Sequence, residues 1–115
     1  MKHSIDSYLE KLNNQPHDVS FEETIATIDA NYEFTETVFN NGDQCNEAGQ
    51  NSGSCKVFAF AKLHALSEQQ TLNMFAQYYR DVLATPEGAD HQNIRQFMQH
   101  GFDGLRFEKE ALAKK

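Results

Sequence analysis

Apolar residues along most of the chain recur at the three-to-four-residue spacing that is typical of amphipathic helices. This spacing predicts helices that begin near Ser4, Ser20, Ser67 and Asp90, the last of which ends at Gly101. At Ser20 and Ser67, a Glu or Gln follows three residues later, the capping-box pattern of a helix start. The apolar positions of these helices are Ile5, Tyr8, Leu9 and Leu12; Phe21, Ile25, Ile28 and Tyr32; Leu72, Phe75, Tyr79, Val82 and Leu83; and Ile94, Phe97 and Met98.

A different pattern occupies the centre of the chain. Residues 57–66 are apolar on nearly every side, which is typical of a helix that is buried all round. We expect this helix to begin at Ser54 or Cys55 and to lie in the middle of the fold, with Phe58, Phe60 and Leu63 buried.

Two short segments favour strands over helices. Residues 34–39 are rich in β-branched and aromatic side chains, and residues 105–107 can supply a partner strand. The fold class expected for residues 1–115 is therefore α+β: a mostly helical single domain of about five helices with a small two-stranded β element. Residues 109–115 are charged and short of apolar side chains, and we expect them to be a frayed tail.

The charge of the chain argues against a nucleic-acid partner. The net charge is -7, and between Lys11 and Lys56 there are eight carboxylates and no Lys or Arg. Such a segment repels a phosphate backbone. Both an acidic face for a basic partner and a solvated face that keeps the protein soluble fit this pattern.

The sequence favours a cytoplasmic protein with reduced thiols. No apolar run approaches the roughly 18 residues of a membrane-spanning helix, and Met1–Asp6 has no apolar stretch of a secretory signal. We therefore expect no membrane partner. The two cysteines, Cys45 and Cys55, are too few for a disulfide framework, and we expect them not to be bonded to each other in the cell.

A polar stretch of fifteen residues, Asn40–Ser54, separates the expected strand from the central helix. We expect it to be ordered, because its asparagines and glutamines can supply the hydrogen bonds that order requires. Two interpretations remain open: a recognition site, or a rigid plug that shields the central helix. The binding residues expected here and at the helix start are Asn46, Asn51, Gly53, Ser54 and Lys56.

One set of residues suggests nucleophilic catalysis. Cys55 in the first turn of a helix beside Lys56 is expected to have a lowered pKa. With His91 as base and Asn93 as orienting amide, it has the chain order of some cysteine hydrolases and deamidases. The alternative is that Cys55 is a small buried residue below a helix cap. The loop lacks the spacing of a phosphate-binding Walker A motif, and no paired metal-ligand spacing occurs, so we expect neither a cofactor nor a metal.

Several runs of the sequence resemble the HopJ type III effector family. The likeness extends over about residues 5–107, and the runs that carry it are Phe39–Gly42, Asn46–Asn51, Gly53–Lys56, Phe58–Leu63, Tyr78–Leu83, Thr85–Gly88 and Asp90–Arg95. The resemblance implies a bacterial protein that is delivered into host cells by a type III secretion system. A cytoplasmic bacterial protein that shares the domain is an equal alternative. The family brings no known activity or catalytic residue.

Three classes of function remain open. The first is a binding or interaction domain with an unidentified protein or small-molecule partner. The second is a hydrolase or deamidase that depends on Cys55 and His91. The remainder includes anion binding, because a glycine-rich loop that leads into a helix leaves backbone amides unpaired.

Overall fold

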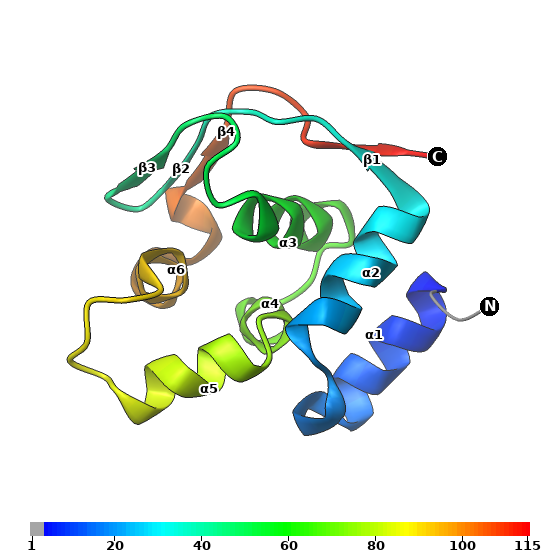
Figure 1. Ribbon diagram of the computed structural model, residues 1–115, viewed down its shortest axis with the longest axis horizontal. Helices are drawn as coiled ribbons and strands as arrows, with labels where there is room; N and C mark the ends of the chain where they lie inside the picture. Colours follow the sequence, from blue (N-terminus) through cyan, green and yellow to red (C-terminus); the bar gives the residue numbers. More distant parts are fainter. Residues whose placement is uncertain (1–3) are drawn as a thin grey trace.

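The computed structural model describes residues 4–115, so the first three residues of the segment tested for a signal peptide lie outside it. The described chain contains six α-helices, two short 3-10 helices and five three-residue strands (Figure 1). In chain order they are α1 (Ile5–Asn14), η1 (Pro16–Asp18), α2 (Phe21–Asn31), β1 (Tyr32–Phe34), β2 (Phe39–Asn41), β3 (Gln44–Asn46), α3 (Ser52–Leu63), α4 (Glu68–Met74), α5 (Gln77–Ala84), α6 (Gln92–His100), η2 (Gly101–Gly104), β4 (Leu105–Phe107) and β5 (Leu112–Lys114). The fold is α+β and mostly helical, which confirms the expected class. No helix within residues 4–115 has the length and apolar content needed to cross a membrane.

Helix α3 lies in the middle of the fold, where it contacts α2, α4 and β5 (Figure 1). Val57, Phe58 and Phe60 are 0% exposed, so the prediction of a central buried helix is confirmed. The ring of Phe58 lies 5.0 Å from that of Phe97 and 5.4 Å from that of Phe75, which joins α3 to α6 and to the end of α4. The prediction for Leu63 is wrong: it is the last residue of α3 and is 57% exposed.

The helix expected from Ser67 to Leu83 is broken in two. Its start follows the sequence prediction, because Ser67 Oγ accepts from the Gln70 amide at 3.0 Å and Gln70 Oε1 accepts from the Ser67 amide at 2.8 Å. At Ala76 the backbone turns to φ 54°, and α5 begins in a new direction. Phe75 and Ala76 are each 2% exposed, so the turn buries both residues. This break raises the number of α-helices from about five to six.

The strands form two small antiparallel sheets instead of one two-stranded element. The segment expected as a single strand contains the end of β1 and the start of β2, which belong to different sheets: β1 pairs with β5, and β2 lies between β3 and β4. The expected partner strand is confirmed, with Phe39 opposite Phe107 and their rings stacked at 5.6 Å.

The prediction of a frayed tail over residues 109–115 is wrong. Residues Leu112–Lys114 form β5, which pairs with β1 along its whole length. Ala111 is 3% exposed and Leu112 is 5% exposed. The few apolar residues near the C-terminus are therefore part of the core, although charged residues surround them in the sequence.

The Asn40–Ser54 stretch is ordered, as expected, but much of it is a β-hairpin. Strands β2 and β3 pair around a tight turn at Gly42 and Asp43, where Gly42 has a φ of +60°. Helix α3 begins at Ser52, two residues before the expected start, and its N-cap is Asn51 instead of Ser54. The hairpin contacts α6, so it lies beside a segment about fifty residues further along the chain.

Candidate functional site

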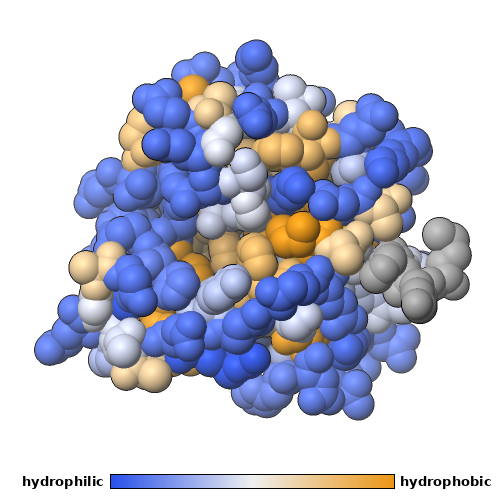
Figure 2. Space-filling model, in the orientation of Figure 1, coloured by the Kyte–Doolittle hydropathy of each residue, from blue (hydrophilic) through white to orange (hydrophobic). Residues whose placement is uncertain are grey.

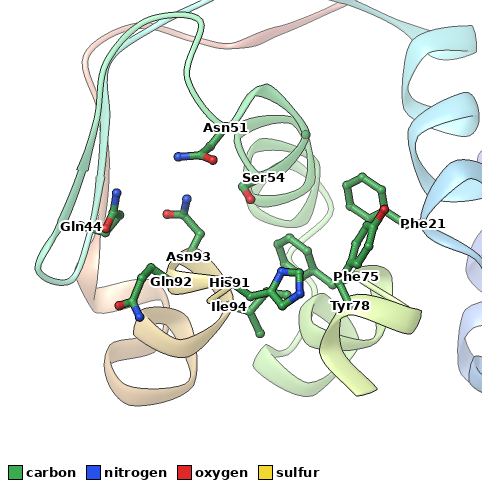
Figure 3. A pocket seen from close by; sticks show the side chains of 11 residues that line it. Phe21, Gln44, Asn51, Ser54, Phe75, Tyr78, His91, Gln92, Asn93 and Ile94 are labelled. Carbon is green, nitrogen blue, oxygen red and sulfur yellow. The ribbon is translucent and has the colours of Figure 1, made fainter. Parts of the chain in front are cut away.

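A pocket of about 480 Å³ lies between the starts of α3 and α6. We call it the α3–α6 pocket. Its lining residues are Phe21, Gln44, Asn51, Gly53, Ser54, Phe75, Tyr78, His91, Gln92, Asn93 and Ile94 (Figure 3). On the corresponding face of the molecule, apolar surface appears near the middle and is surrounded by polar side chains (Figure 2).

Four helices begin at the edge of this pocket. Its lining includes the first residue of α2 and residues from the first turns of α3, α5 and α6. Asn51 and His91, the N-caps of α3 and α6, both have a left-handed backbone with a φ of 51°, and neither side chain caps its helix. The starts of α3 and α6 are therefore left without the side-chain oxygen that ordinarily satisfies first-turn amides.

Unpaired backbone amides result at both helix starts. In α3 the first amide with a partner is that of Cys55, which donates to the Asn51 carbonyl at 3.0 Å. Within residues 4–115, the preceding amides of α3 and the first amides of α6 find no hydrogen-bond acceptor; they belong to Ser52, Gly53, Ser54, Gln92 and Asn93. Such amides carry the partial positive charge of a helix N-terminus and favour an anion or a carbonyl oxygen.

An aromatic wall faces these amides across the pocket. The ring of Phe21 stacks on that of Phe75 at 6.0 Å and meets the edge of Tyr78 at 5.0 Å. His91 continues the wall, with its ring 5.4 Å from that of Tyr78. Gly53 makes room for it, because a Cβ at this position would lie 2.9 Å from Phe21 Cζ.

Four asparagines form a hydrogen-bonded group at the pocket, which we call the asparagine cluster: Asn51 and Asn93 line the pocket, and the buried Asn41 and Asn46 lie beneath it. Asn46 and Asn93 form a reciprocal pair, with Asn46 Nδ2 donating to Asn93 Oδ1 at 3.1 Å and Asn93 Nδ2 donating to Asn46 Oδ1 at 3.0 Å. Asn51 Nδ2 donates to Asn46 Oδ1 at 2.6 Å. Asn41 Nδ2 donates to Asn93 Oδ1 at 3.1 Å and to the Asn93 carbonyl at 2.7 Å. The cluster thus joins β2, β3, α3 and α6.

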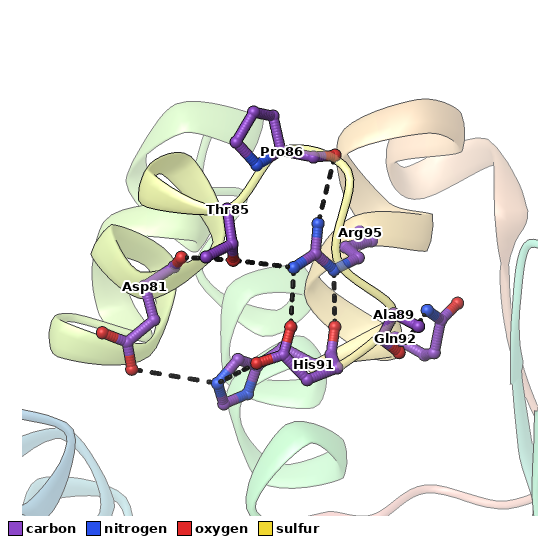
Figure 4. A network of polar contacts seen from close by, with 8 residues as sticks. Asp81, Thr85, Pro86, Ala89, His91, Gln92 and Arg95 are labelled. Carbon is purple, nitrogen blue, oxygen red and sulfur yellow. Dashed lines mark hydrogen bonds and ion pairs between the residues drawn. The ribbon is translucent and has the colours of Figure 1, made fainter.

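The segment that leads into α6 is fixed by Arg95 (Figure 4). Its Nε donates to the Asp90 carbonyl at 2.5 Å, and its Nη2 donates to Asp90 Oδ1 at 2.6 Å and to Thr85 Oγ1 at 3.2 Å. Its Nη1 donates to the Pro86 carbonyl at 3.3 Å. The Arg95 hydrogen bond lowers the pKa of the Asp90 carboxyl. This one side chain therefore holds the approach to His91 in place.

The lining of the pocket contains no Asp or Glu, although the chain has 17 acidic residues. The carboxylates that face His91 are those of Asp81 and Asp90, whose oxygens lie 3.9 Å and 3.8 Å from His91 Nε2. Both side chains are more than half exposed, so water screens their charge. The pocket is therefore a non-acidic site on an acidic protein.

The predicted nucleophile does not fit this site. Cys55 is 2% exposed and is absent from the pocket lining. Burial raises the pKa of its thiol to about 11, so the prediction of a lowered pKa is wrong. The reason is that desolvation of the thiolate outweighs the helix N-terminus, and the Lys56 ammonium is turned away to Asp29 at 2.8 Å and to the ring of Phe34. Lys56 therefore does not reach the pocket either.

The other predicted residues come together. His91, Asn93, Asn51, Gly53 and Ser54 line the pocket, and Asn46 lies below it with 0% exposure.

Sequence reasoning missed the aromatic wall and Asn41. Phe21, Phe75 and Tyr78 have the spacing of ordinary core residues, and nothing in that spacing sets them apart. For Asn41 a signal existed, since Asn41-Gly42 is a strong hairpin pattern that places a polar side chain next to a strand end.

No group of three or more His, Cys, Asp or Glu side chains in residues 4–115 is arranged to hold a metal ion. The polar groups at the pocket are amides, one serine hydroxyl, one phenol and one imidazole. These groups suit hydrogen bonding to a ligand better than metal coordination.

Comparison with known proteins gives a family and a structural neighbour. The crystal structure of VPA0580, described as a protein of unknown function, is 47% identical in sequence and superimposes with a TM-score of 0.96. The match covers 100% of this chain and 97% of that one. No curated protein matches this chain. A model of the HopJ type III effector protein family matches residues 5–112, nearly the whole chain, and the protein therefore belongs to this family.

Proposed function

We propose that this protein is a binding domain for a small molecule that carries an anionic group beside a planar apolar group. The observation that supports this most is the composition of the α3–α6 pocket. It combines unpaired amides from two helix starts with an aromatic wall, and it lacks carboxylates.

The two sides of the pocket suit the two parts of such a ligand. The amides of Gly53, Ser54 and Gln92 can donate to a carboxylate or phosphate, which the helix dipoles also favour. Phe21 and Tyr78 offer a surface against which a flat ring can pack. A volume of about 480 Å³ lies in the range of small-ligand pockets.

A catalytic role for Cys55 has less support than binding. The thiol is buried, its pKa is raised, and it does not line the pocket. The place of action that we propose is the bacterial cytoplasm, or a host cell reached through type III secretion. The family description supports the second of these.

Titrations of the isotope-labelled protein with phenyl phosphate, benzoate and inorganic phosphate test the proposal by NMR. We expect saturating shifts of the backbone amides of Gly53, Ser54, Gln92 and Asn93. Neutral benzamide, which keeps the ring and lacks the charge, is expected to bind at least about tenfold more weakly than benzoate. Shifts scattered over surface lysines and arginines, or no saturation with any probe, would show that the pocket is not an anion site.

A charge variant provides a matched control. Ser54→Asp places a carboxylate beside the unpaired amides and is expected to abolish phenyl phosphate binding by repulsion and by competition for the same donors. Ser7→Asp makes the same change on the exposed side of α1 and is expected to leave binding unchanged. Equal losses in both variants would mean that overall charge, and not the pocket, governs binding.

A further inference from the structure

We propose that Asn46 is the positioning residue of the α3–α6 pocket: its buried amide fixes the start of α6 against the start of α3. This inference rests on the proposed function for its biological meaning. The geometry that it concerns is a property of the protein without ligand, so it can be tested even if no ligand binds.

The position of Asn46 in the asparagine cluster supports this role. Asn46 is 0% exposed and does not line the pocket, yet its Oδ1 accepts from two residues that do, Asn51 at 2.6 Å and Asn93 at 3.0 Å. Asn51 is the N-cap of α3, and Asn93 is the second residue of α6. One buried oxygen atom therefore holds both helix starts.

Asn46 also links α6 to the hairpin of β2 and β3. Asn46 Nδ2 donates to Asn93 Oδ1 at 3.1 Å and makes longer bonds of 3.4 Å to the carbonyls of Phe39 and Gln44. These bonds anchor Asn46 in its own hairpin while it contacts α6. Loss of Asn46 should consequently shift the first turn of α6 relative to the start of α3. No other side chain of the described chain bonds both Asn51 and Asn93.

The chemistry of this position requires a group that donates and accepts at once. An amide does both, whereas a carboxylate only accepts. In Asn46→Asp an ionised carboxylate would face Asn93 Oδ1, an acceptor facing an acceptor. A protonated carboxylic acid has one donor and one acceptor, so it restores the reciprocal pair. In this variant the reciprocal hydrogen bonds between residue 46 and Asn93 are therefore present when the carboxyl is protonated and lost when it is ionised.

The direction of this pH effect follows from burial. Desolvation at this fully buried site, together with the acceptor Asn93 Oδ1 facing the carboxylate, raises the folded-state pKa of the carboxyl above its unfolded value of about 3.9. These effects oppose the bonds accepted from Asn51 and Asn93, which lower the pKa. A raised folded pKa means that the native geometry is favoured at low pH and is lost as pH rises through that value. The Asn46→Asp variant should thus resemble the wild type near pH 5 or below and differ from it near pH 7.

Other titratable groups on the elements around Asn46 do not confuse this comparison. They are Asp43, Cys45 and Glu47 on the hairpin or directly after it, Cys55, Lys56 and Lys62 on α3, His91, Arg95 and His100 on α6 or its ends, and Arg106 on β4. All of them are also present in Asn40→Asp, a change on the exposed side of β2 in the same hairpin. This variant is the matched control, and its amide spectrum should follow that of the wild type at every pH.

The experiment records backbone amide shifts of the unliganded variants between pH 5 and pH 7. For Asn46→Asp we expect the amides of Gly53, Gln92 and Asn93 to move at pH 7 and to return at pH 5. Phenyl phosphate affinity at pH 7 should fall about tenfold or more, because small displacements of positioning groups have effects of this size. A uniform loss of stability with unchanged shifts at these amides would overturn the proposal and leave Asn46 a purely structural residue.

A second variant covers the case in which Asn46→Asp does not fold at pH 7. Asn51→Gly removes only the 2.6 Å bond to Asn46, and glycine suits the left-handed backbone of this N-cap. We expect it to fold and to shift the amides of Gln92 and Asn93 in α6, across the pocket from the substitution. Shifts confined to the neighbours of Asn51 in the sequence would contradict the inference. If wild type binds no probe but these shifts occur, the proposed function fails and the positioning role stands.

Discussion

Single residues show how burial can reverse what local sequence suggests. The start of a helix and a neighbouring lysine both favour a thiolate at Cys55, yet its pKa rises to about 11 because the thiol is desolvated. Cys45, which has no such helix start, is exposed. The reactive thiol of this protein is therefore expected to be that of Cys45, which the sequence did not indicate as a nucleophile.

Alkylation followed by mass spectrometry tests this at residue level. With iodoacetamide near pH 8 we expect one label on the folded protein, at Cys45, because only on the order of one Cys55 thiol in a thousand is ionised at that pH. The urea-denatured protein is the control and should take up two labels. Modification of Cys55 at a rate close to that of Cys45 would contradict the buried environment described here.

Gly53 is a second residue at which the surroundings decide how a substitution affects stability. Gly53→Ala gains about 1 kcal/mol of helix propensity, but the new methyl group would lie 2.9 Å from Phe21 Cζ. Overpacking of this kind costs about 1–3 kcal/mol. We expect unfolding free energy to fall by at most about 2 kcal/mol, while phenyl phosphate binding weakens because Phe21 moves. Ser52→Ala lies in the same helix turn and lacks the Phe21 contact. It should keep the free energy of unfolding, measured in urea, and the phenyl phosphate affinity, measured by titration, near those of the wild type.

At the scale of elements, the sequence predicts helix starts accurately where they use local hydrogen bonds, and less accurately or not at all where they do not. Ser20 and Ser67 accept from the amides of Glu23 and Gln70, as their motifs indicate. Asn51, Ala76 and His91 start helices from positive-φ backbones, which no local motif specifies. At Ala76 the turn is buried, with 2% of the residue exposed, so the break between α4 and α5 depends on tertiary packing and could not be predicted from the local sequence.

The C-terminal strand shows the same limit, because its partner β1 is about eighty residues away in the sequence. Leu112→Ala should lower the unfolding free energy by about 2–4 kcal/mol, since a buried leucine is lost and a cavity remains. Lys114→Ala, an exposed change in the same strand, should stay within about 0.5 kcal/mol of wild type in urea unfolding. Equal, small effects of the two variants would contradict a packed β5 and support the frayed tail expected from the charged sequence.

At the scale of the whole molecule, the pocket depends on contacts that no sequence window contains. Asn41 and Asn46 lie 52 and 47 residues from Asn93, to which they bond. The sequence supplied five of the pocket residues by chemical type, but not the fact that α2, α3, α5 and α6 all begin at one place. The central helix α3 joins several of these elements directly, because it contacts α2 and because its Phe58 packs against Phe97 of α6.

The stability of the whole molecule should fall on both sides of neutral pH, because burial lowers the pKa of His64 and raises those of Tyr8, Tyr32 and Cys55. Burial lowers the pKa of His64 below 6.5, and its Nε2 lies 2.8 Å from the Tyr32 hydroxyl. As pH falls, His64 therefore takes up a proton in the unfolded chain before it does so in the folded protein. Stability is lost as pH falls below about 6.5. Burial raises the pKa of Tyr8 above 10.0. The unfolded tyrosine ionises first, so stability is present below pH 10 and is lost above it.

Urea unfolding at about pH 5, 8 and 10.5 separates the acid-side contribution of His64 from the alkaline-side contribution of Tyr8, Tyr32 and Cys55. The lower limit stays above the range in which Glu22 and Asp90, whose pKa values are lowered, take up protons. His64→Gln keeps a polar partner for Tyr32 and should flatten the acid side alone. Tyr8→Phe should reduce the alkaline loss and leave the part due to Cys55 and Tyr32, whose pKa values burial also raises. The exposed His17→Gln is the control and should retain the wild-type profile on both sides. An acid-side loss that persists in His64→Gln would assign that loss to other groups, because the variant has no imidazole at this position to take up a proton.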